Sequence, residues 1–320
     1  MNWLMLIAGL VILTGGAEVL IRGSVALARR FNLSELLIGL TLVGFGTSTP
    51  EMVSSIQAAL VGSPGVAVGN VVGSNIANIL LILGVSAALA PIAVEPKSFQ
   101  RDAIALSLAT LLAVGVSFTG EFGRIAGAGF IAAIVTYIAV AYLDERKAPA
   151  SPETQRHEEE AAALPQGPRS PLLDLLMCAA GLALLIVGAR FLITGAIAIA
   201  RDLGVSETII GLTIVAVGTS LPELVTSTLS VLRGKGALAL GNVVGSNIYN
   251  ILGILGATAL VKPVAVPPEI VRFDNWVMLG ATAVMILFSL THRRISRREG
   301  WVLLTGYVVY VGWLVAHAAG

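Results

Sequence analysis

The sequence has 320 residues, of which 56% are hydrophobic and only 12% are charged, and its mean hydropathy is +0.89. A soluble domain carries roughly 25% charged residues, so this composition excludes a soluble globular protein and indicates an integral membrane protein. The formal net charge is +1 and there is no basic stripe, which argues against a nucleic-acid partner. Cys178 is the single cysteine, which excludes an intramolecular disulfide and a thiolate metal cluster.

Ten apolar runs are each long enough to cross a hydrocarbon core, which takes about 20 residues. In chain order they fall near residues 3–27, 36–60, 66–90, 102–119, 125–143, 172–199, 208–232, 238–261, 275–291 and 300–318. The first run lacks the basic start and the cleavage site of a signal peptide, so we expect it to remain as a helix. The polar segment 144–170, rich in charges and prolines, predicts an exposed linker.

The two halves of the chain repeat one another. The segment GLTLVGFGTSTPEMVSS (39–55) aligns with GLTIVAVGTSLPELVTS (211–227), and GNVVGSNIANILLILG (69–84) aligns with GNVVGSNIYNILGILG (241–256). Both alignments have the same offset, because 223 − 51 = 172 and 245 − 73 = 172. A constant offset over two long motifs indicates an internal duplication.

Each half holds five predicted crossings, and an odd number forces the second half to enter the membrane from the opposite side. We therefore predict an all-α membrane protein of ten transmembrane helices, built as two inverted five-helix repeats. The first repeat covers residues 1–143, the linker 144–170 and the second repeat 171–320. Inverted repeats are typical of secondary transporters, which bind their substrate near the bilayer midplane.

The basic residues are distributed unequally between the loops. Loops after odd-numbered helices carry fourteen Lys and Arg residues, whereas loops after even-numbered helices carry four. The positive-inside rule then predicts a multi-pass protein of the cell membrane with a cytoplasmic linker and both termini outside. We expect its partners to be the lipid bilayer and inorganic cations, and we expect it to work as a monomer.

Glu51 and Glu223 lie deep inside apolar runs, at equivalent positions of the two halves. A carboxylate at that depth costs at least ~2.5 kcal/mol, so it indicates an ion or proton pathway. A single glutamate of this kind can also be a protonated structural residue. Two that are related by the repeat are expected to meet at the centre.

A proline precedes each glutamate and lacks an N–H. Pro50 should therefore free the carbonyl of Gly46, and Pro222 that of Gly218, with a kink in each helix. Non-helical backbone at membrane depth survives where it lines a cavity or is buried in protein. The freed carbonyls are thus candidate ligands.

Hydroxyl and amide groups surround both glutamates in duplicate. These groups belong to Thr47, Ser48, Asn70, Ser74 and Asn78 in the first half and to Thr219, Ser220, Asn242, Ser246 and Asn250 in the second. Thr47 and Ser48 precede Glu51 by about one helical turn, so their hydroxyls should share a helix face with its carboxylate. Ligands made only of oxygen suit calcium, magnesium, manganese or alkali cations and disfavour zinc and copper. Two carboxylates also match the charge of one divalent ion.

The segments GTSTPE (46–51) and GTSLPE (218–223), each followed by GNVVGSNI (69–76 and 241–248), resemble the two α-repeats of the sodium/calcium exchanger superfamily. The spacing, the ten-helix pattern and the linker resemble its compact prokaryotic members along essentially the whole chain. This resemblance implies a transporter rather than an enzyme, with no cofactor. It implies exchange of Na⁺ for Ca²⁺ by alternating access, in which the first and sixth helices slide across the others.

The resemblance also implies ligands for each ion. Calcium would be held by Glu51 and Glu223 with the backbone carbonyls of Thr47 and Thr219. Sodium ions would use the same glutamates with the side chains of Thr47, Ser48 and Ser246 on one side and of Thr219, Ser220 and Ser74 on the other. Carbonyls of Gly44 and Ala216 would complete the sodium sites.

One position departs from several relatives. Asn250 stands where they, including the potassium-dependent branch, carry Asp, and it matches Asn78 of the first half. Two titratable groups instead of three weaken any expectation of potassium coupling. Exchange of H⁺ for Ca²⁺ or another divalent cation stays open, because both glutamates can carry protons. A cation channel is a further alternative, which the inverted symmetry disfavours, and no motif of an intramembrane enzyme is present.

Overall fold

The computed structural model describes residues 2–30, 45–147, 170–232, 234 and 236–317, together with four single positions of the linker. Eight helices in this part of the chain are long and apolar enough to span a membrane, and a pair of helices bent by 48° at Ser220 makes a ninth if the pair is counted as one span. Only residues from 45 onward of the predicted run 36–60 are described, and they include one helix, α3 (Thr49–Leu60). The fold is all-α, and the predicted tenth crossing lies partly outside the described residues.

The helices of the first repeat follow in chain order with short strands between them. They are α1 (Asn2–Arg30), α3, the continuous rod α4–η2–α5 (Pro64–Ala77, Asn78–Leu83, Gly84–Leu89), α6 (Pro96–Ser117) and α7 (Arg124–Lys147). In the second repeat they are α9 (Pro171–Leu203), α10–η3–α11 (Glu207–Ile210, Gly211–Val215, Ala216–Thr219), α12 (Leu221–Leu232), α13–η4–α14 (Gly236–Ile248, Tyr249–Leu255, Gly256–Val261), η5–α15 (Ile270–Asp274, Asn275–Leu290) and α16 (Arg297–Ala316). The predicted helices therefore occur in the predicted order, with ends that differ by several residues.

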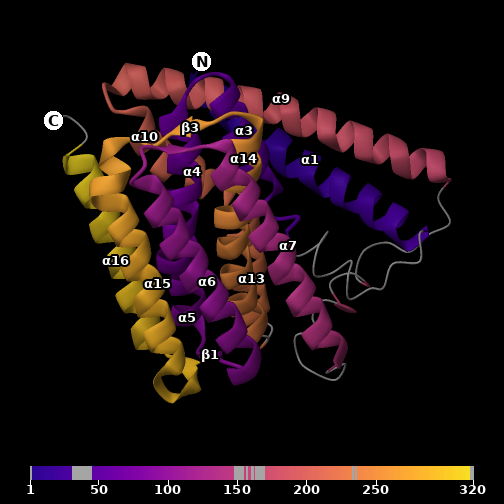
Figure 1. Ribbon diagram of the computed structural model, residues 1–320, viewed down its shortest axis with the longest axis vertical. Coiled ribbons are helices and arrows are strands. Elements are labelled where there is room, and N and C mark those ends of the chain that lie inside the picture. Colours follow the sequence, from indigo (N-terminus) through magenta and orange to yellow (C-terminus); the bar gives the residue numbers. More distant parts are fainter. Residues whose placement is uncertain are drawn as a thin grey trace.

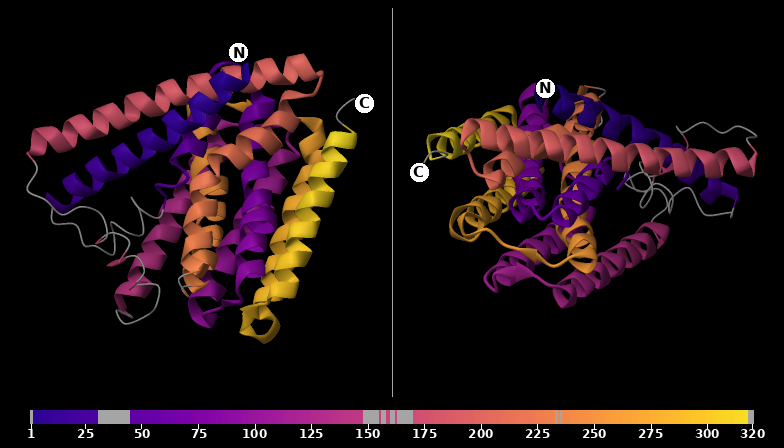
Figure 2. Two further views of the ribbon diagram at one scale, coloured as in Figure 1. Left: turned by 180° about the vertical axis from the view of Figure 1, so that it is seen from behind. Right: turned by 90° about the horizontal axis from the view of Figure 1, so that it is seen from above.

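The two longest helices, α1 and α9, pack against each other and lie obliquely across the rest of the molecule (Figure 1 and Figure 2). Glycines recur every seven residues on both, at 9, 16 and 23 and at 181, 188 and 195. A Cβ on Gly188 would lie 2.7 Å from the backbone nitrogen of Leu13. Gly9 packs on Leu192, and Gly23 packs on Asp174 near the opposite end of the contact, so the helices run antiparallel. Only glycine allows this approach of the two main chains.

The rods α4–η2–α5 and α13–η4–α14 form the centre of the molecule. In the most apolar stretch of each rod, 83% and 78% of the residues are buried, whereas the share is 44% or less in the six other long helices. The fifth helix of each repeat covers the third helix of the other: α16 packs on α5 and η2, and α7 packs on α14 and η4. The outer helices thus interlock the repeats around two buried rods.

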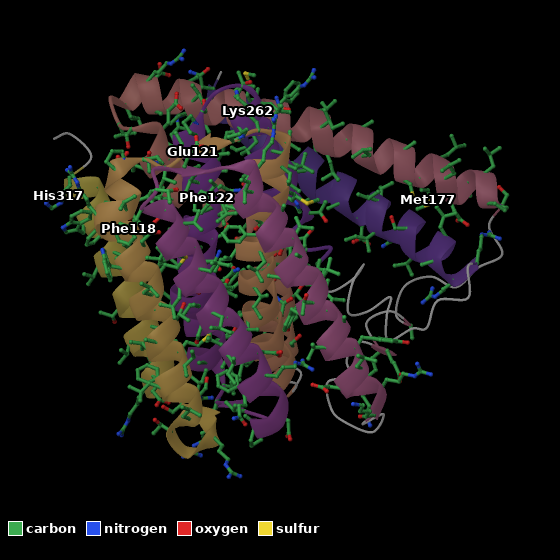
Figure 3. The ribbon with its side chains drawn as sticks, viewed as in Figure 1. Phe118, Glu121, Phe122, Met177, Lys262 and His317 are labelled. Atoms are coloured by element: carbon green, nitrogen blue, oxygen red, sulfur yellow. The ribbon has the colours of Figure 1, made fainter. Side chains whose placement is uncertain are left out.

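Two short antiparallel strand pairs also join one repeat to the other. Strand β1 (Ile92–Ala93) pairs with β4 (Arg294–Ile295), and β2 (Glu121–Phe122) pairs with β3 (Val264–Ala265). Figure 1 shows β1 and β3 at opposite ends of the helices. Glu121 and Phe122 lie at the same end as Lys262, which precedes β3 (Figure 3). Exchanging the two repeats turns one strand pair into the other.

Candidate cation site

Both predicted glutamates lie in the first turn of a helix that begins at the centre of the molecule. Glu51 follows a turn at residues 45–48 and the start of α3, and Glu223 follows the break between α11 and α12. A proline in the first turn leaves no hydrogen bond unmade, so Pro50 and Pro222 favour helix starts here. The unpaired N–H groups of a helix start favour a nearby carboxylate. Local sequence therefore fixes where the two acids stand.

The structure differs from the sequence prediction at two backbone details. The carbonyl of Gly46 is not free, because it accepts a hydrogen bond from the N–H of Thr49 at 3.2 Å. Ser48 lies in the turn before α3 and not on the helix face of Glu51. The N–H of Thr49 bonds to the carbonyl three residues earlier, whereas in an α-helix it would bond to the carbonyl four residues earlier. This tighter turn changes the direction of the Ser48 side chain. Gly44, the predicted carbonyl ligand, lies outside the described residues.

Serines of each repeat bind the glutamate of the other repeat. The hydroxyl of Ser48 donates to Oε1 of Glu223 at 2.8 Å, and that of Ser220 donates to Oε1 of Glu51 at 2.8 Å. Both glutamates have no exposed surface, and both serines are buried. These crossed bonds bring the two carboxylates to one place, and Oε2 of each has no hydrogen-bond partner among the described residues.

Several further oxygens of the predicted set are buried without a hydrogen-bond partner among the described residues. They are Oγ1 of Thr47, Oγ of Ser246, Oδ1 of Asn78 and Oδ1 of Asn250. Buried polar atoms are rarely left unpaired, because each such atom costs free energy. Two carboxylate oxygens and four neutral oxygens without partners match the donor set of a hard cation.

Three other predicted ligands lie together but make hydrogen bonds of their own. Ser74 Oγ donates to the carbonyl of Ala216 at 3.4 Å. The hydroxyl of Thr219 is 3.2 Å from Oδ1 of Asn70 and 3.0 Å from the carbonyl of Val215. Thr47 and Thr219 also neighbour the carboxylates of Glu223 and Glu51, respectively, so both threonines belong to the same site.

Two asparagines join the elements around the site: Asn70, one of the predicted amide groups, and Asn247, which the prediction omits. Asn70 donates to the carbonyl of Glu51 at 3.2 Å and to Ser55 at 2.9 Å. Asn247 accepts from Asn78 at 2.9 Å and donates to the carbonyl of Asn75 at 3.2 Å, so it joins the two central rods. The signal was present in the sequence, because both copies of GNVVGSNI carry these asparagines.

A family model described as "Sodium/calcium exchanger protein" matches residues 1–143 and 173–316. The chain belongs to this family. It is similar to the putative antiporter CaxA of Alkalimonas amylolytica, at 40% identity over 308 residues, which is 95% of each chain. It is also similar to the sodium/calcium exchanger MaX1 of Methanosarcina acetivorans, at 33% identity over 97% of each chain.

A solved structure of the sodium-calcium exchanger NCX_Mj, soaked with 2.5 mM Na⁺ and 0.1 mM Ca²⁺, has the same fold. The TM-score is 0.63 at 30% identity, and the match covers 99% of this chain and 98% of that one. The resemblance drawn from the GTSTPE and GTSLPE motifs is thereby confirmed. Together with the spanning helices, membership of the sodium/calcium exchanger family makes this chain a membrane-embedded cation/Ca²⁺ antiporter and places it in a family of transporters rather than enzymes.

Proposed function

We propose that the protein exchanges Na⁺ for Ca²⁺ by alternating access, at a site near the bilayer midplane that centres on Glu51 and Glu223. The observation that carries the proposal is the crossed pair of Ser–Glu hydrogen bonds, in which one oxygen of each buried carboxylate has no partner in the part of the chain that the structure describes. The site would be completed by the hydroxyls and amides of Thr47, Thr219, Ser74, Ser246, Asn78 and Asn250, with the carbonyls of Gly44 and Ala216. Sodium coupling is also in line with the printed names of MaX1 and NCX_Mj.

Charge balance couples the two ions in this scheme. Two buried carboxylates carry a charge that is costly to move through the hydrocarbon core, so the empty site resists crossing. One calcium ion, or several sodium ions in its place, neutralises the pair and allows the change of access. Obligatory exchange follows from this, because only loaded forms cross.

The architecture proposed for this cycle is ten helices in two inverted repeats, 1–143 and 171–320, acting as a monomer. Support comes from contacts that occur twice, once from each repeat to the other. They are the Ser–Glu bonds, the strand pairs, and the packing of α7 and α16. The start of α1 and the end of α16 lie at the end of the molecule that carries β3 (Figure 1). The unequal distribution of basic residues supports an orientation with that end outside the cell and the linker in the cytoplasm.

Potassium coupling is not part of the proposal. Asn250 replaces the Asp expected in potassium-dependent relatives, and both polar atoms of its side chain are buried without a partner. A neutral amide adds an oxygen ligand but no charge. We therefore expect the same exchange rate with and without K⁺ on either side.

Glu51→Gln and Glu223→Gln test the two acids. Each change keeps the shape and removes one of the two charges, so calcium uptake driven by a sodium gradient should fall to the level of empty proteoliposomes. Glu18→Gln is the matched control, because Glu18 is an exposed glutamate that pairs with Arg22 one turn away, and such pairs contribute little. Normal uptake by either of the first two variants, with retained elution as a folded protein, would refute the site.

Replacing the driving ion identifies the coupling. Wild-type proteoliposomes loaded with calcium-sensitive dye are given an outward sodium gradient, an outward proton gradient or neither. Sodium exchange predicts uptake only in the first case. Uptake in the second case alone would assign the protein to H⁺/Ca²⁺ antiport on the same scaffold, and uptake in the third would identify a pore.

A further inference from the structure

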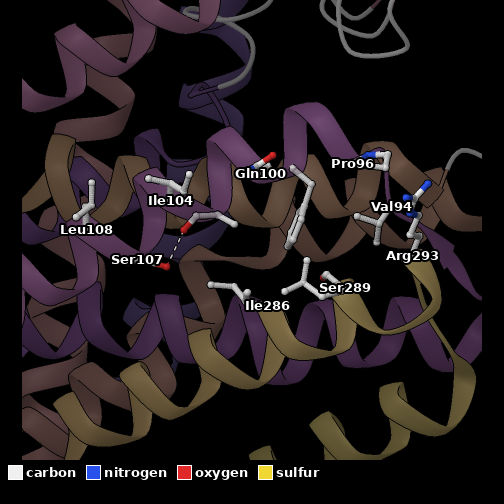
Figure 4. A pocket seen from close by; sticks show the side chains of 12 residues that line it. Val94, Pro96, Gln100, Ile104, Ser107, Leu108, Ile286, Ser289 and Arg293 are labelled. Atoms are coloured by element: carbon white, nitrogen blue, oxygen red, sulfur yellow. Dashed lines mark hydrogen bonds between the residues drawn. The ribbon is translucent and has the colours of Figure 1, made fainter.

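A cavity of about 630 Å³ lies between α6 and α15, and none of the candidate cation ligands lines it. Its wall is mostly apolar and includes Phe99, Ile104, Leu108, Ile286 and Leu290 (Figure 4). Ile104, Leu108 and Leu290 are also among the exposed apolar residues of the outer surface. The cavity therefore opens on a surface that faces acyl chains when the helices span a bilayer.

The length of the cavity matches one lipid leaflet. Its lining on α6 runs from Pro96 to Leu108. These twelve steps (108 − 96) correspond to roughly 18 Å of helix rise. One leaflet contributes about half of a hydrocarbon core of roughly 30 Å. An extended acyl chain would fill this space along its length.

A cationic group stands at one end of the cavity. Figure 4 shows Arg293 beside Val94 at the end opposite Leu108. The N–H of Val94 donates to the carbonyl of Arg293 at 3.0 Å, next to the β1–β4 pair, and fixes the arginine there. Arg293 is the only non-glycine residue with positive φ in the described part of the chain, at 52°. The three arginines at 294, 297 and 298 are exposed and add positive charge at the same end.

An unpaired hydroxyl lies between the charged end and the apolar wall. Thr282 and Thr291 donate to the carbonyls four residues earlier, as hydroxyls in membrane helices usually do. Ser289 lines the cavity and is 1% exposed, yet its Oγ has no partner in the described structure. The Oγ atom itself is buried, as are the Oγ atoms of Ser54 and Ser86 elsewhere, so Ser289 does not present an exposed donor to the cavity.

We propose that the α6–α15 cavity binds one anionic phospholipid. One acyl chain lies along the apolar wall, and the phosphate meets the guanidinium of Arg293. Guanidinium and phosphate form charge-assisted hydrogen bonds, and basic groups at the membrane surface attract anionic lipid. The apolar wall selects a lipid over a free phosphate, because a free phosphate would leave the rest of the cavity unfilled.

The test uses the purified, delipidated full-length protein in detergent. Phosphatidylglycerol and phosphatidylcholine with the same acyl chains are titrated separately, and bound lipid is counted by native mass spectrometry. We expect wild-type protein to prefer phosphatidylglycerol by about fivefold or more, which corresponds to one basic contact. Arg293→Gln should lower this preference by about fivefold, whereas Arg294→Gln, which changes a neighbour outside the lining, should lower it by less.

A second variant tests the cavity itself. Ser107→Leu fills the space from α6 and should lower binding of both lipids, while sodium-driven calcium uptake in neutral liposomes shows that the protein is folded. Equal binding of both lipids by wild-type protein would overturn the proposal. Competition by glycerol phosphate at the same concentration as lipid would also overturn it, since that result describes an anion site without an acyl chain.

Discussion

At the scale of residues, the serines hold the glutamates of the opposite repeat. Each hydroxyl donates to one carboxylate oxygen at 2.8 Å, and the other carboxylate oxygen has no partner among the described residues. A hydrogen bond to a charged group inside a protein contributes about 1.5–3 kcal/mol. In the proposed site the serines therefore orient the acids.

Ser48→Ala and Ser220→Ala should each weaken the apparent calcium affinity by about tenfold to a hundredfold, because one carboxylate loses the donor that orients it. Equal effects are expected from the two changes, since the bonds are related by the repeat. Sodium-driven uptake as a function of calcium concentration measures the affinity. Ser86→Ala is the control, since Ser86 is a buried serine of α5 whose hydroxyl has no partner in the described structure. An unchanged affinity in Ser48→Ala would remove the orienting role.

Much of the candidate site was predictable from the duplicated motifs. Glu51, Glu223 and their hydroxyl neighbours follow from position and residue type alone. The crossed pairing was not predictable. Spacing alone predicts that Ser48 shares a face of α3 with Glu51, whereas residues 45–48 form a turn and the Ser48 hydroxyl donates to Glu223 of the other repeat. Sequence spacing predicts contacts within a helix, and this contact depends on how two helix starts meet.

At the scale of elements, helix order was predictable and several ends were not. Hydropathy placed the fourth crossing at 102–119, whereas α6 begins at Pro96. Its first turns carry Lys97, Arg101 and Asp102, which an apolar window omits, although proline is favoured at a helix start. Hydropathy also did not predict a Tyr–Asp hydrogen bond that occurs in both repeats. Asp102 accepts from Tyr137 at 3.0 Å, and in the second repeat Asp274 accepts from Tyr310 at 2.8 Å.

The α1–α9 contact gives a prediction about packing. Gly9→Ala would place a Cβ 2.8 Å from the carbonyl oxygen of Gly188, so the two main chains must separate. Such overpacking costs about 1–3 kcal/mol and should lower the temperature of thermal unfolding in detergent. Gly15→Ala lies on the same helix with nothing within 4 Å of the new Cβ and should leave that temperature unchanged or raise it. Similar unfolding temperatures for both variants would show that close approach at Gly9 is not required.

At the scale of the whole molecule, the two ends differ in charge. The β1–β4 end carries Lys97 and Arg101 in the first turns of α6, and arginines at 293, 294, 297 and 298. The β2–β3 end carries Arg124, Lys262 and Arg272. Since the two strand pairs cap opposite ends of α6, this difference assigns a side of the membrane to each end if the positive-inside rule holds.

Glu95 and Glu121 report on those sides, because both are exposed and they flank the two ends of α6. In a Cys178→Ala background, which removes the only cysteine, Glu121→Cys should react with a membrane-impermeant maleimide added to intact cells, and Glu95→Cys should not. Both should react after the membrane is permeabilised, which controls for access to each thiol. The reverse pattern would place the basic loops outside and invert the proposed orientation, and labelling of both in intact cells would contradict a span between them. Lys262→Cys, at the β3 end, should be labelled in the same way as Glu121→Cys. Its repeat equivalent is residue 90 (262 − 172), which comes shortly before Glu95 in the sequence. The proposed inverted repeat therefore puts these two equivalent positions on opposite sides of the membrane.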